Sequence, residues 1–265
     1  MSKKRKKRRT AGDIIRNLVL ILAIGVFAFS AFQLGKIFLE YKEGTDEYNR
    51  VREYVTVADT ETEDKEDAEN KEPEAPKPLP PQVDFNGLKA INPEVIGWIQ
   101  IEGTSISYPI MKGKDNDYYL KHTFEGNYNA AGSIFIDYTN NSNFEDCNTI
   151  IYGHNMKNGS MFGLLRKHFK DRESVPGRYI WICTPDKNYR YEIFSSHVVD
   201  AAGEVYTLFS APDQQFAAYL ENMKSQSLVD FGTEVTEKDK IITLSTCTGN
   251  DATRFVVQAK REGSY

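Results

Sequence analysis

The chain has 265 residues, so one core of roughly 150–200 residues with appendages is expected. The net charge of −5 is uneven, because residues 1–16 hold eight Lys or Arg and one Asp, which leaves −12 for the remainder. An acidic folded part excludes a basic nucleic-acid footprint, and we expect no nucleic-acid partner. Three cysteines without a CxxC pair and four histidines exclude a zinc-finger site and a disulfide-stapled mini-protein. No motif for a metal or an organic cofactor is present, and none is expected.

The N-terminus combines a basic cluster with an apolar run. Seven Lys or Arg residues span 3–9, and the run from Leu18 to Leu34 is broken only by Gly25, Ser30 and Gln33. Such a run is about long enough to cross a bilayer as a helix. A cleaved signal peptide shares the basic start, but its apolar part is shorter and ends at a small-residue cleavage site. We therefore predict a retained anchor over residues 17–39.

The basic cluster also predicts the orientation of the anchor. The positive-inside rule places residues 1–16 in the cytoplasm and everything after about residue 36 outside the cell. A nuclear or nucleic-acid-binding tail is the alternative interpretation of such a cluster. Its position directly before an apolar span favours the first interpretation, a single-pass membrane protein with an extracellular domain.

The segment after the anchor changes character twice. Residues 40–57 are charged with scattered apolar positions, which permits a juxtamembrane helix. Residues 58–82 are acidic, contain five prolines and have almost no large apolar side chain, which is typical of a linker. We thus assign residues 40–83 to a juxtamembrane helix and an acidic, Pro-rich linker, and residues 84–265 to one extracellular domain.

Short strands dominate the predicted domain. Eight segments are rich in β-branched or aromatic residues and are bounded by turn residues, which predicts a mainly β barrel or sandwich. They cover residues 95–101, 105–110, 132–136, 149–152, 178–183, 190–199, 241–245 and 255–259. Helical patterns are fewer and cover residues 85–90, 161–169 and 212–224. In the last pattern Phe216, Leu220 and Met223 share one helix face.

The three cysteines have different surroundings. Cys183 lies inside an apolar run, where a buried small hydrophobe is expected. Cys147 follows two carboxylates, which would raise the pKa of its thiol. Cys247 lies between an apolar strand and a polar turn, where a substrate can reach the sulfur while the sheet holds it. Cys247 is therefore the candidate nucleophile, and a disulfide between Cys147 and Cys183 is a further hypothesis.

A nucleophilic thiol needs a cationic or basic neighbour. Arg254 opens the strand after the turn that follows Cys247, so a tight connection would bring it close to the sulfur. A solvated charge at a strand edge is the alternative role for this arginine. His154 also follows the end of a strand, after Gly153, whereas His122, His168 and His197 lie in ordinary surface or packing contexts. A His and a Cys past the ends of different strands could meet at one rim of a barrel.

These residues resemble those of a known family. The segment 243–247 (TLSTC) resembles the signature of sortases, the membrane-anchored cysteine transpeptidases of Gram-positive bacteria. The segments 152–154 (YGH) and 254–257 (RFVV) are similar to the histidine and arginine motifs of that family. Class B is the closer match, on residues 96–99, 113–120 and 132–138 and on the helix at 212–224. The resemblance covers about residues 84–261, and the short loop between Cys247 and Arg254 departs from the class.

The resemblance implies a fold and a mechanism. It implies a closed eight-stranded β-barrel with a few peripheral helices. It assigns Cys247 as nucleophile on a C-terminal sorting signal of secreted surface proteins, His154 as acid and base, and Arg254 as a donor to the substrate or its oxyanion. The acyl group would pass to an amine of a cell-wall precursor. By similarity, the residues that line the sorting-signal groove are Asn116, Ser245 and Thr246.

Other functions stay open from the sequence alone. A pilus-assembly sortase that uses a pilin lysine as nucleophile would share all three catalytic residues. A catalytically inactive extracellular domain that binds a surface partner would need none of them. A papain-like hydrolase is disfavoured, because Cys247 follows the histidine and no helix pattern begins at the cysteine.

Overall fold

The computed structural model describes residues 11–56 and 79–265. The basic tail as far as residue 10 and the linker residues 57–78 lie outside this range. Helix α1 (Ala11–Val51) runs without a break through the predicted anchor and the predicted juxtamembrane helix. By length and composition it is a candidate membrane span.

The chain divides into two compact units, residues 1–43 and 44–265. The second unit includes the last turns of α1, where Tyr48 and Val51 are buried. It also includes β1 (Val55–Thr56), which pairs antiparallel with β2 (Gln82–Val83). The compact unit therefore begins well before Asp84.

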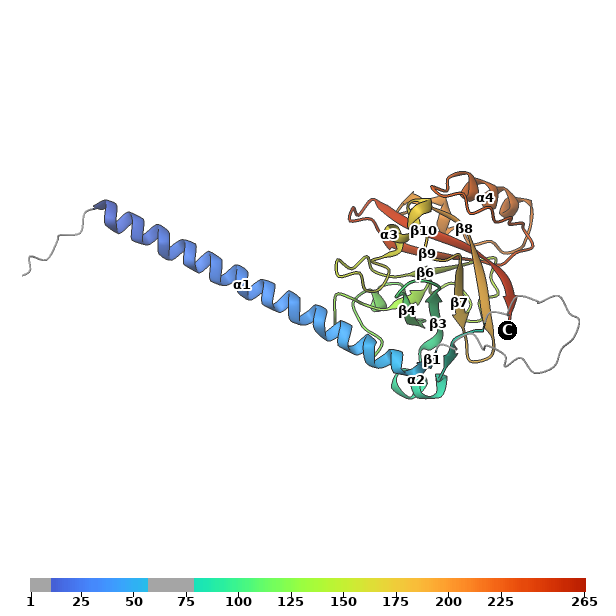
Figure 1. Ribbon diagram of the computed structural model, residues 1–265, viewed down its shortest axis with the longest axis horizontal. Helices are drawn as coiled ribbons and strands as arrows, with labels where there is room; N and C mark the ends of the chain where they lie inside the picture. Colours follow the sequence, from blue (N-terminus) through green and yellow to red (C-terminus); the bar gives the residue numbers. More distant parts are fainter. Residues whose placement is uncertain (1–10, 57–78) are drawn as a thin grey trace, which may run out of the picture. The chain divides into compact units, whose positions relative to one another are not determined.

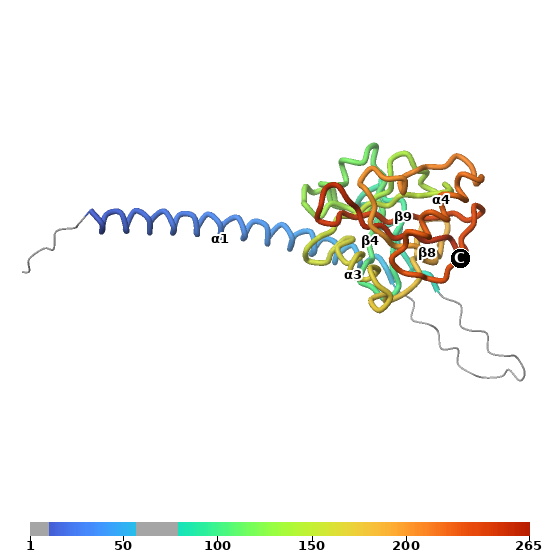
Figure 2. Tube along the Cα trace, turned by 90° about the horizontal axis from the view of Figure 1, so that it is seen from above, coloured from blue at the N-terminus to red at the C-terminus, as the bar shows by residue number. Residues whose placement is uncertain are grey.

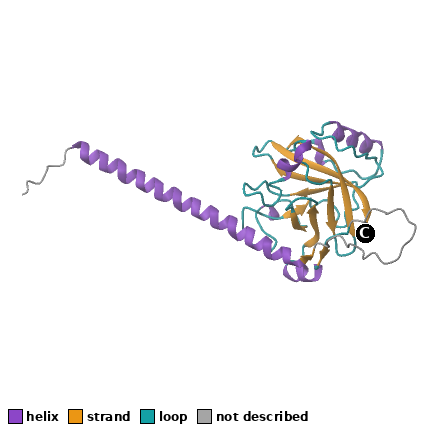
Figure 3. Ribbon diagram, in the orientation of Figure 1, coloured by secondary structure: helices purple, strands orange, loops and turns teal. Residues whose placement is uncertain are grey.

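Eight strands of the described residues close into a barrel in the order β10-β8-β7-β3-β4-β5-β6-β9, which confirms the predicted fold. Neighbouring strands pair antiparallel except for β4 with β5 and β6 with β9, which are parallel. Figure 3 shows the strands gathered in the body, with the short helices at its margin. The strands are β3 (Val95–Ile101), β4 (Ser107–Met111), β5 (Ile134–Ile136), β6 (Asn148–Tyr152), β7 (Tyr179–Cys183), β8 (Asn188–Asp200), β9 (Ile241–Cys247) and β10 (Thr253–Ser264).

The remaining elements are short helices. The α-helices are α2 (Phe85–Ile91), α3 (Leu165–Phe169) and α4 (Gln214–Ser225). The 3₁₀ helices are η1 (Arg52–Tyr54), η2 (Tyr118–Leu120), η3 (Arg172–Ser174) and η4 (Glu204–Tyr206). Helix α3 is shorter than the predicted 161–169, because Met161 adopts a positive φ of 54°, which an α-helix does not allow.

Helix α4 covers the outer face of the last two barrel strands (Figure 1, Figure 2). The Asp213 side chain caps its N-terminus by accepting hydrogen bonds from two backbone N–H groups. Its apolar face, Phe216, Leu220 and Met223, packs with Ile241 of β9 and Val256 of β10 in one buried cluster. Because β9 is thus buried on both faces, its end is held firmly, and Cys247 is at that end.

Candidate active site

Two parallel strands bring the histidine and cysteine motifs together. In the register of β6 and β9, Tyr152 lies opposite Ser245. The Gly153 N–H donates to the Ser245 carbonyl at 3.1 Å, which continues the pairing past the end of β6. Next to His154, the Asn155 side chain donates to the Cys247 carbonyl at 2.8 Å. His154 therefore lies just past the end of β6, and Cys247 is the last residue of the neighbouring strand β9.

The arginine is on the other side of the cysteine. Strands β9 and β10 pair antiparallel with Arg254 directly opposite Cys247. Directly opposed residues point to the same face of a sheet. The Arg254 Nη1 donates to the backbone carbonyls of Asp251 and Thr253, each at 2.9 Å. These bonds hold the Nη1 end of the guanidinium at the turn between β9 and β10.

The His154 ring is oriented by a backbone carbonyl. Its Nε2 lies 2.7 Å from the carbonyl oxygen of Leu120. Because a carbonyl only accepts hydrogen bonds, Nε2 carries the proton of this contact. In the neutral ring Nδ1 is then the basic nitrogen.

One cavity of about 380 Å³ unites these groups. Cys247, His154 and Arg254 all line it and are partly exposed, so substrate and solvent can reach them. A second cavity, of about 530 Å³ around Lys89 and Tyr189, contains none of the three. The other residues that line the first cavity are Asn116, Asp117, Leu120, Phe135, Tyr152, Gly153, Ala201, Tyr206, Ser245 and Thr246.

The three predicted groove residues line the same cavity in different ways. Asn116 uses both ends of its amide, donating to Asp137 at 2.7 Å and accepting from the Tyr138 N–H at 3.0 Å. The Ser245 hydroxyl lies 2.7 Å from the Tyr206 hydroxyl. Thr246 is 2% exposed, and its hydroxyl has no hydrogen-bond partner within the described residues. Asn116 and Ser245 thus bond to other residues beside the cavity, whereas the Thr246 side chain is buried.

Sequence reasoning missed Tyr206. This residue ends η4 in the connection between β8 and α4, and it lines the cavity beside Ser245 of β9. Burial raises the pKa of its phenol above the usual value, although the Ser245 hydroxyl and the Arg254 charge oppose that shift. Its segment matches no motif, so only the three-dimensional contact with Ser245 reveals it.

Asp137 was also missed and organises the wall behind Asn116. It accepts hydrogen bonds from Asn116 at 2.7 Å and from the Tyr152 hydroxyl at 3.0 Å. Burial alone would raise the pKa of this carboxyl, but these bonds and two from Thr139 outweigh burial and lower it. Asp137 therefore stays ionised and fixes the β5 end of the cavity.

The other two cysteines lie outside the cavity. Cys147 packs in the cluster under α4, and burial is the main reason that the pKa of its thiol is raised. Burial raises the pKa of Cys183 to about 12. The predicted disulfide is wrong, since both are free thiols. The barrel order explains this, because β3, β4 and β5 separate the strand of Cys183 from β6, which follows Cys147.

Comparison with known proteins places this geometry in a family. A sortase-domain family model matches residues 99–262. The chain is 34% identical over 250 residues to sortase B of Listeria monocytogenes, covering 92% of this chain and 95% of that protein.

The chain also resembles solved structures of sortase B. One from Bacillus anthracis has a TM-score of 0.68 at 34% identity and covers 85% of this chain and 99% of that one. One from Clostridium perfringens has a TM-score of 0.63 at 38% identity and covers 68% and 100%. The chain therefore belongs to the sortase family of cysteine transpeptidases, as a class B member.

Proposed function

We propose that this transpeptidase cleaves a C-terminal sorting signal of secreted surface proteins and transfers the acyl part to an amine of a cell-wall precursor. The observation that supports this most is the shared cavity of Cys247, His154 and Arg254 at the ends of adjoining strands. A nucleophile, a base and an oxyanion donor around one cavity are the groups that acyl transfer requires.

In the proposed first half-reaction, the Cys247 thiol passes its proton to His154 Nδ1, and the thiolate that forms attacks the scissile carbonyl carbon. The carbonyl electrons move to oxygen, where the Arg254 guanidinium donates hydrogen bonds to the oxyanion. The carbon–nitrogen bond then breaks, and His154 gives its proton to the departing amine. The product is a thioester on Cys247 and a free C-terminal fragment.

In the second half-reaction, an incoming amine attacks the thioester carbon. His154 accepts the proton that the amine loses, and the Cys247 sulfur leaves as a thiolate when the oxyanion collapses. The new amide joins the substrate to the acceptor. His154 then returns this proton to the Cys247 sulfur, so the enzyme regains its starting protonation state without any external reagent.

The composition of the cavity supports a peptide substrate. Apolar surface from Leu120 and Phe135 lies beside polar groups, which suits an extended chain with alternating side chains. We propose Ser245, Thr246 and Asn116 as groove residues. Ser245 and Asn116 would act by shaping the wall, since their polar atoms already have partners.

We further propose that α1 anchors the enzyme with residues 1–16 in the cytoplasm, 17–39 across the membrane, 40–83 as juxtamembrane helix and linker, and 84–265 outside. The support is the basic cluster before the apolar run. This placement suits an enzyme whose substrates and acceptors are held at the outer membrane surface.

The test is a transfer assay with the full chain in detergent, monitored by mass spectrometry. A pool of sorting-signal-like peptides is offered with a peptidoglycan-type amine, with a lysine-containing pilin peptide, or with neither. The proposal predicts tail release and a product with the cell-wall amine. Preference for the pilin lysine would indicate pilus assembly instead. If no peptide reacts and Cys247→Ala has no effect on partner binding, the chain is an inactive binding domain.

A further inference from the structure

The C-terminal end of α1 has a buried carboxylate. Glu47 is 3% exposed, although a buried charge is costly unless it is fully hydrogen-bonded. It accepts hydrogen bonds from the Thr123 hydroxyl at 2.8 Å, the Glu125 N–H at 2.9 Å and the Asn127 side chain at 3.2 Å. All three donors belong to the long connection between β4 and β5. Glu47 therefore ties the helix end to this connection.

Tyr48 makes a second tie to the same connection. It is also 3% exposed, and its hydroxyl donates to the Gly132 carbonyl at 2.5 Å. The same oxygen accepts from the Phe124 N–H at 3.3 Å and lies 3.2 Å from the Ser133 hydroxyl. Its ring packs edge-on against Tyr108 of β4. Glu47 and Tyr48 thus bond to two separate parts of the β4–β5 connection, residues 123–127 and residues 132–133.

The tied residues in turn hold η2, which ends at Leu120. The Ser133 N–H donates to the Tyr119 carbonyl at 2.9 Å, and the Ser133 hydroxyl donates to the His122 carbonyl at 2.8 Å. Gly132 has a φ of +55°, and a Cβ there would be 2.6 Å from the Tyr119 carbonyl oxygen. Ser133, which contacts the Tyr48 hydroxyl, therefore bonds to residues on both sides of Leu120, namely Tyr119 and His122.

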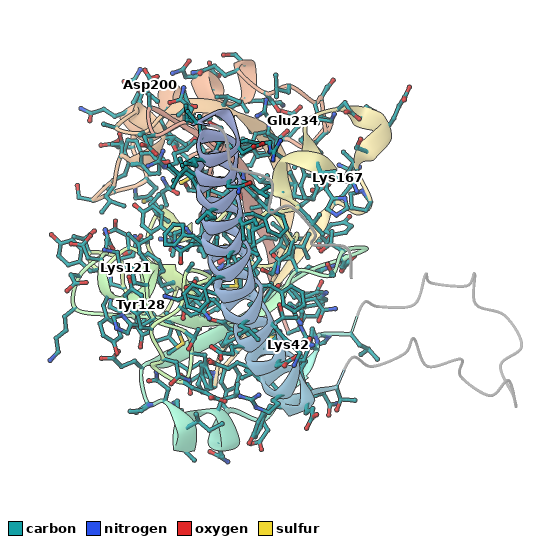
Figure 4. All side chains as sticks on the ribbon, turned by 90° about the vertical axis from the view of Figure 1, so that its left-hand side faces the viewer. Lys42, Lys121, Tyr128, Lys167, Asp200 and Glu234 are labelled. Atoms are coloured by element: carbon teal, nitrogen blue, oxygen red, sulfur yellow. The ribbon has the colours of Figure 1, made fainter. Side chains whose placement is uncertain are left out.

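Leu120 is the residue whose carbonyl accepts from His154 Nε2 at 2.7 Å. The opposite side of η2 is braced separately, because the Tyr119 hydroxyl donates to Glu94 at 2.6 Å. Lys121 and Tyr128 are on the exposed side of the same connection (Figure 4).

We propose that Glu47 and Tyr48 are positioning residues for the active site. They hold the β4–β5 connection so that the Leu120 carbonyl keeps the His154 proton on Nε2 and presents Nδ1 to the cavity. The end of the membrane helix is then part of the support of the catalytic histidine. This inference rests on the proposed catalytic role of His154.

The experiment uses the full chain in detergent with Glu47→Ala and Tyr48→Phe. Tyr48→Phe removes one oxygen and keeps the ring against Tyr108. Arg50→Ala is the matched surface control, because Arg50 makes an exposed ion pair with Glu125 of the same connection at 3.1 Å. Val51→Ala is the control for stability loss, since it shortens a buried apolar side chain at the same helix end.

Two readouts separate positioning from stability. Nitrogen-15 NMR of labelled histidine reports the tautomer of His154, and steady-state kinetics report kcat and KM for the transferred peptide. We expect the Nε2–H form in the wild type and in both controls. We expect a mixture of tautomers and a kcat lowered roughly tenfold to a hundredfold in Glu47→Ala and Tyr48→Phe, with little change in KM.

Each outcome decides the inference. A wild-type tautomer in Tyr48→Phe and Glu47→Ala would overturn it, as would an equal loss of kcat in Val51→Ala. If Glu47→Ala does not fold, Tyr48→Phe alone decides. If His154→Ala keeps full activity, the proposed function of His154 fails, whereas the tautomer measurement still tests the tie between helix and histidine.

Discussion

The two walls of the active-site cavity are built by different means. One wall is made of strand ends, where the registers of β6, β9 and β10 set the positions of His154, Cys247 and Arg254. The other wall is made of connections, where the Leu120 carbonyl lies 2.7 Å from His154 Nε2 and the Tyr206 hydroxyl lies 2.7 Å from the Ser245 hydroxyl. Strand register is cooperative and stiff, whereas a connection depends on a few side chains. In the proposed mechanism, the reacting groups thus lie on the stiff wall, and the loop wall orients them and contacts the substrate.

The largest effect on the transfer rate should come from Cys247, at the end of β9. Removing the sulfur in Cys247→Ala should lower the transfer rate by roughly 10⁴-fold or more, because no thioester can form. Cys183→Ala serves as the control, because this buried thiol is remote from the cavity. Peptide tail release measured by mass spectrometry checks both. Equal activity of wild type and Cys247→Ala would show that the Cys247 sulfur takes no part in the reaction.

A smaller but still large effect is expected at Arg254. Arg254→Lys keeps the charge and loses the planar fork, so kcat should fall roughly 10²-fold to 10³-fold with KM changed less. Arg178→Lys is a suitable control, since this arginine pairs with Glu192 on the surface. A similar kinetic effect of both substitutions would show that Arg254 acts only as a surface charge.

The barrel should also be sensitive to acid through His197 of β8, a neighbour of the strand wall. This residue of β8 lies opposite Val256 of β10, and burial lowers the pKa of its imidazole from 6.5 to about 4. The unfolded chain then binds the proton more readily than the folded chain. The contribution of the neutral His197 to the free energy of unfolding is therefore fully present above pH 6.5 and is lost as the pH drops toward 4. The loss should reach about 3 kcal/mol.

Denaturant unfolding of wild type and His197→Gln between pH 4 and 7 measures this loss. The glutamine of the variant does not bind a proton in this pH range. The free energy of unfolding of His197→Gln should therefore depend less steeply on pH than that of the wild type. An unchanged slope in His197→Gln would assign the acid sensitivity to other groups.

The smallest effect should come from the loop wall. Tyr206→Phe removes the hydroxyl that bonds Ser245 and leaves the ring over the cavity. One hydrogen bond contributes about 1 kcal/mol, so kcat/KM should fall about fivefold, mainly through KM. Tyr138→Phe, at an exposed tyrosine, is the control. A loss as large as that of Arg254→Lys would contradict the division between the walls.

The same division explains what the sequence could predict. Strand segments carry their own pattern, so the barrel, β3 and the ends of β6 and β9 were predicted close to their observed bounds. Cys247 ends β9, His154 follows β6 and Arg254 is near the start of β10. Each belongs to a short motif, and the motifs marked all three as candidates. Tyr206 and Asp137 belong to connections whose positions depend on contacts with residues distant in sequence, and no local pattern marks them. The burial of Glu47 was hidden for the same reason, because its three donors lie about eighty residues away.

The most direct test of the strand-wall chemistry is to locate the acyl group on the enzyme. The full chain is incubated with a reactive sorting-signal peptide without an amine, quenched in acid, digested and mapped by mass spectrometry. We predict one thioester, on Cys247, and its disappearance when an acceptor amine is added. An acyl group on Cys147 or Cys183, or tail release without any acyl group on Cys247, would contradict the proposed mechanism.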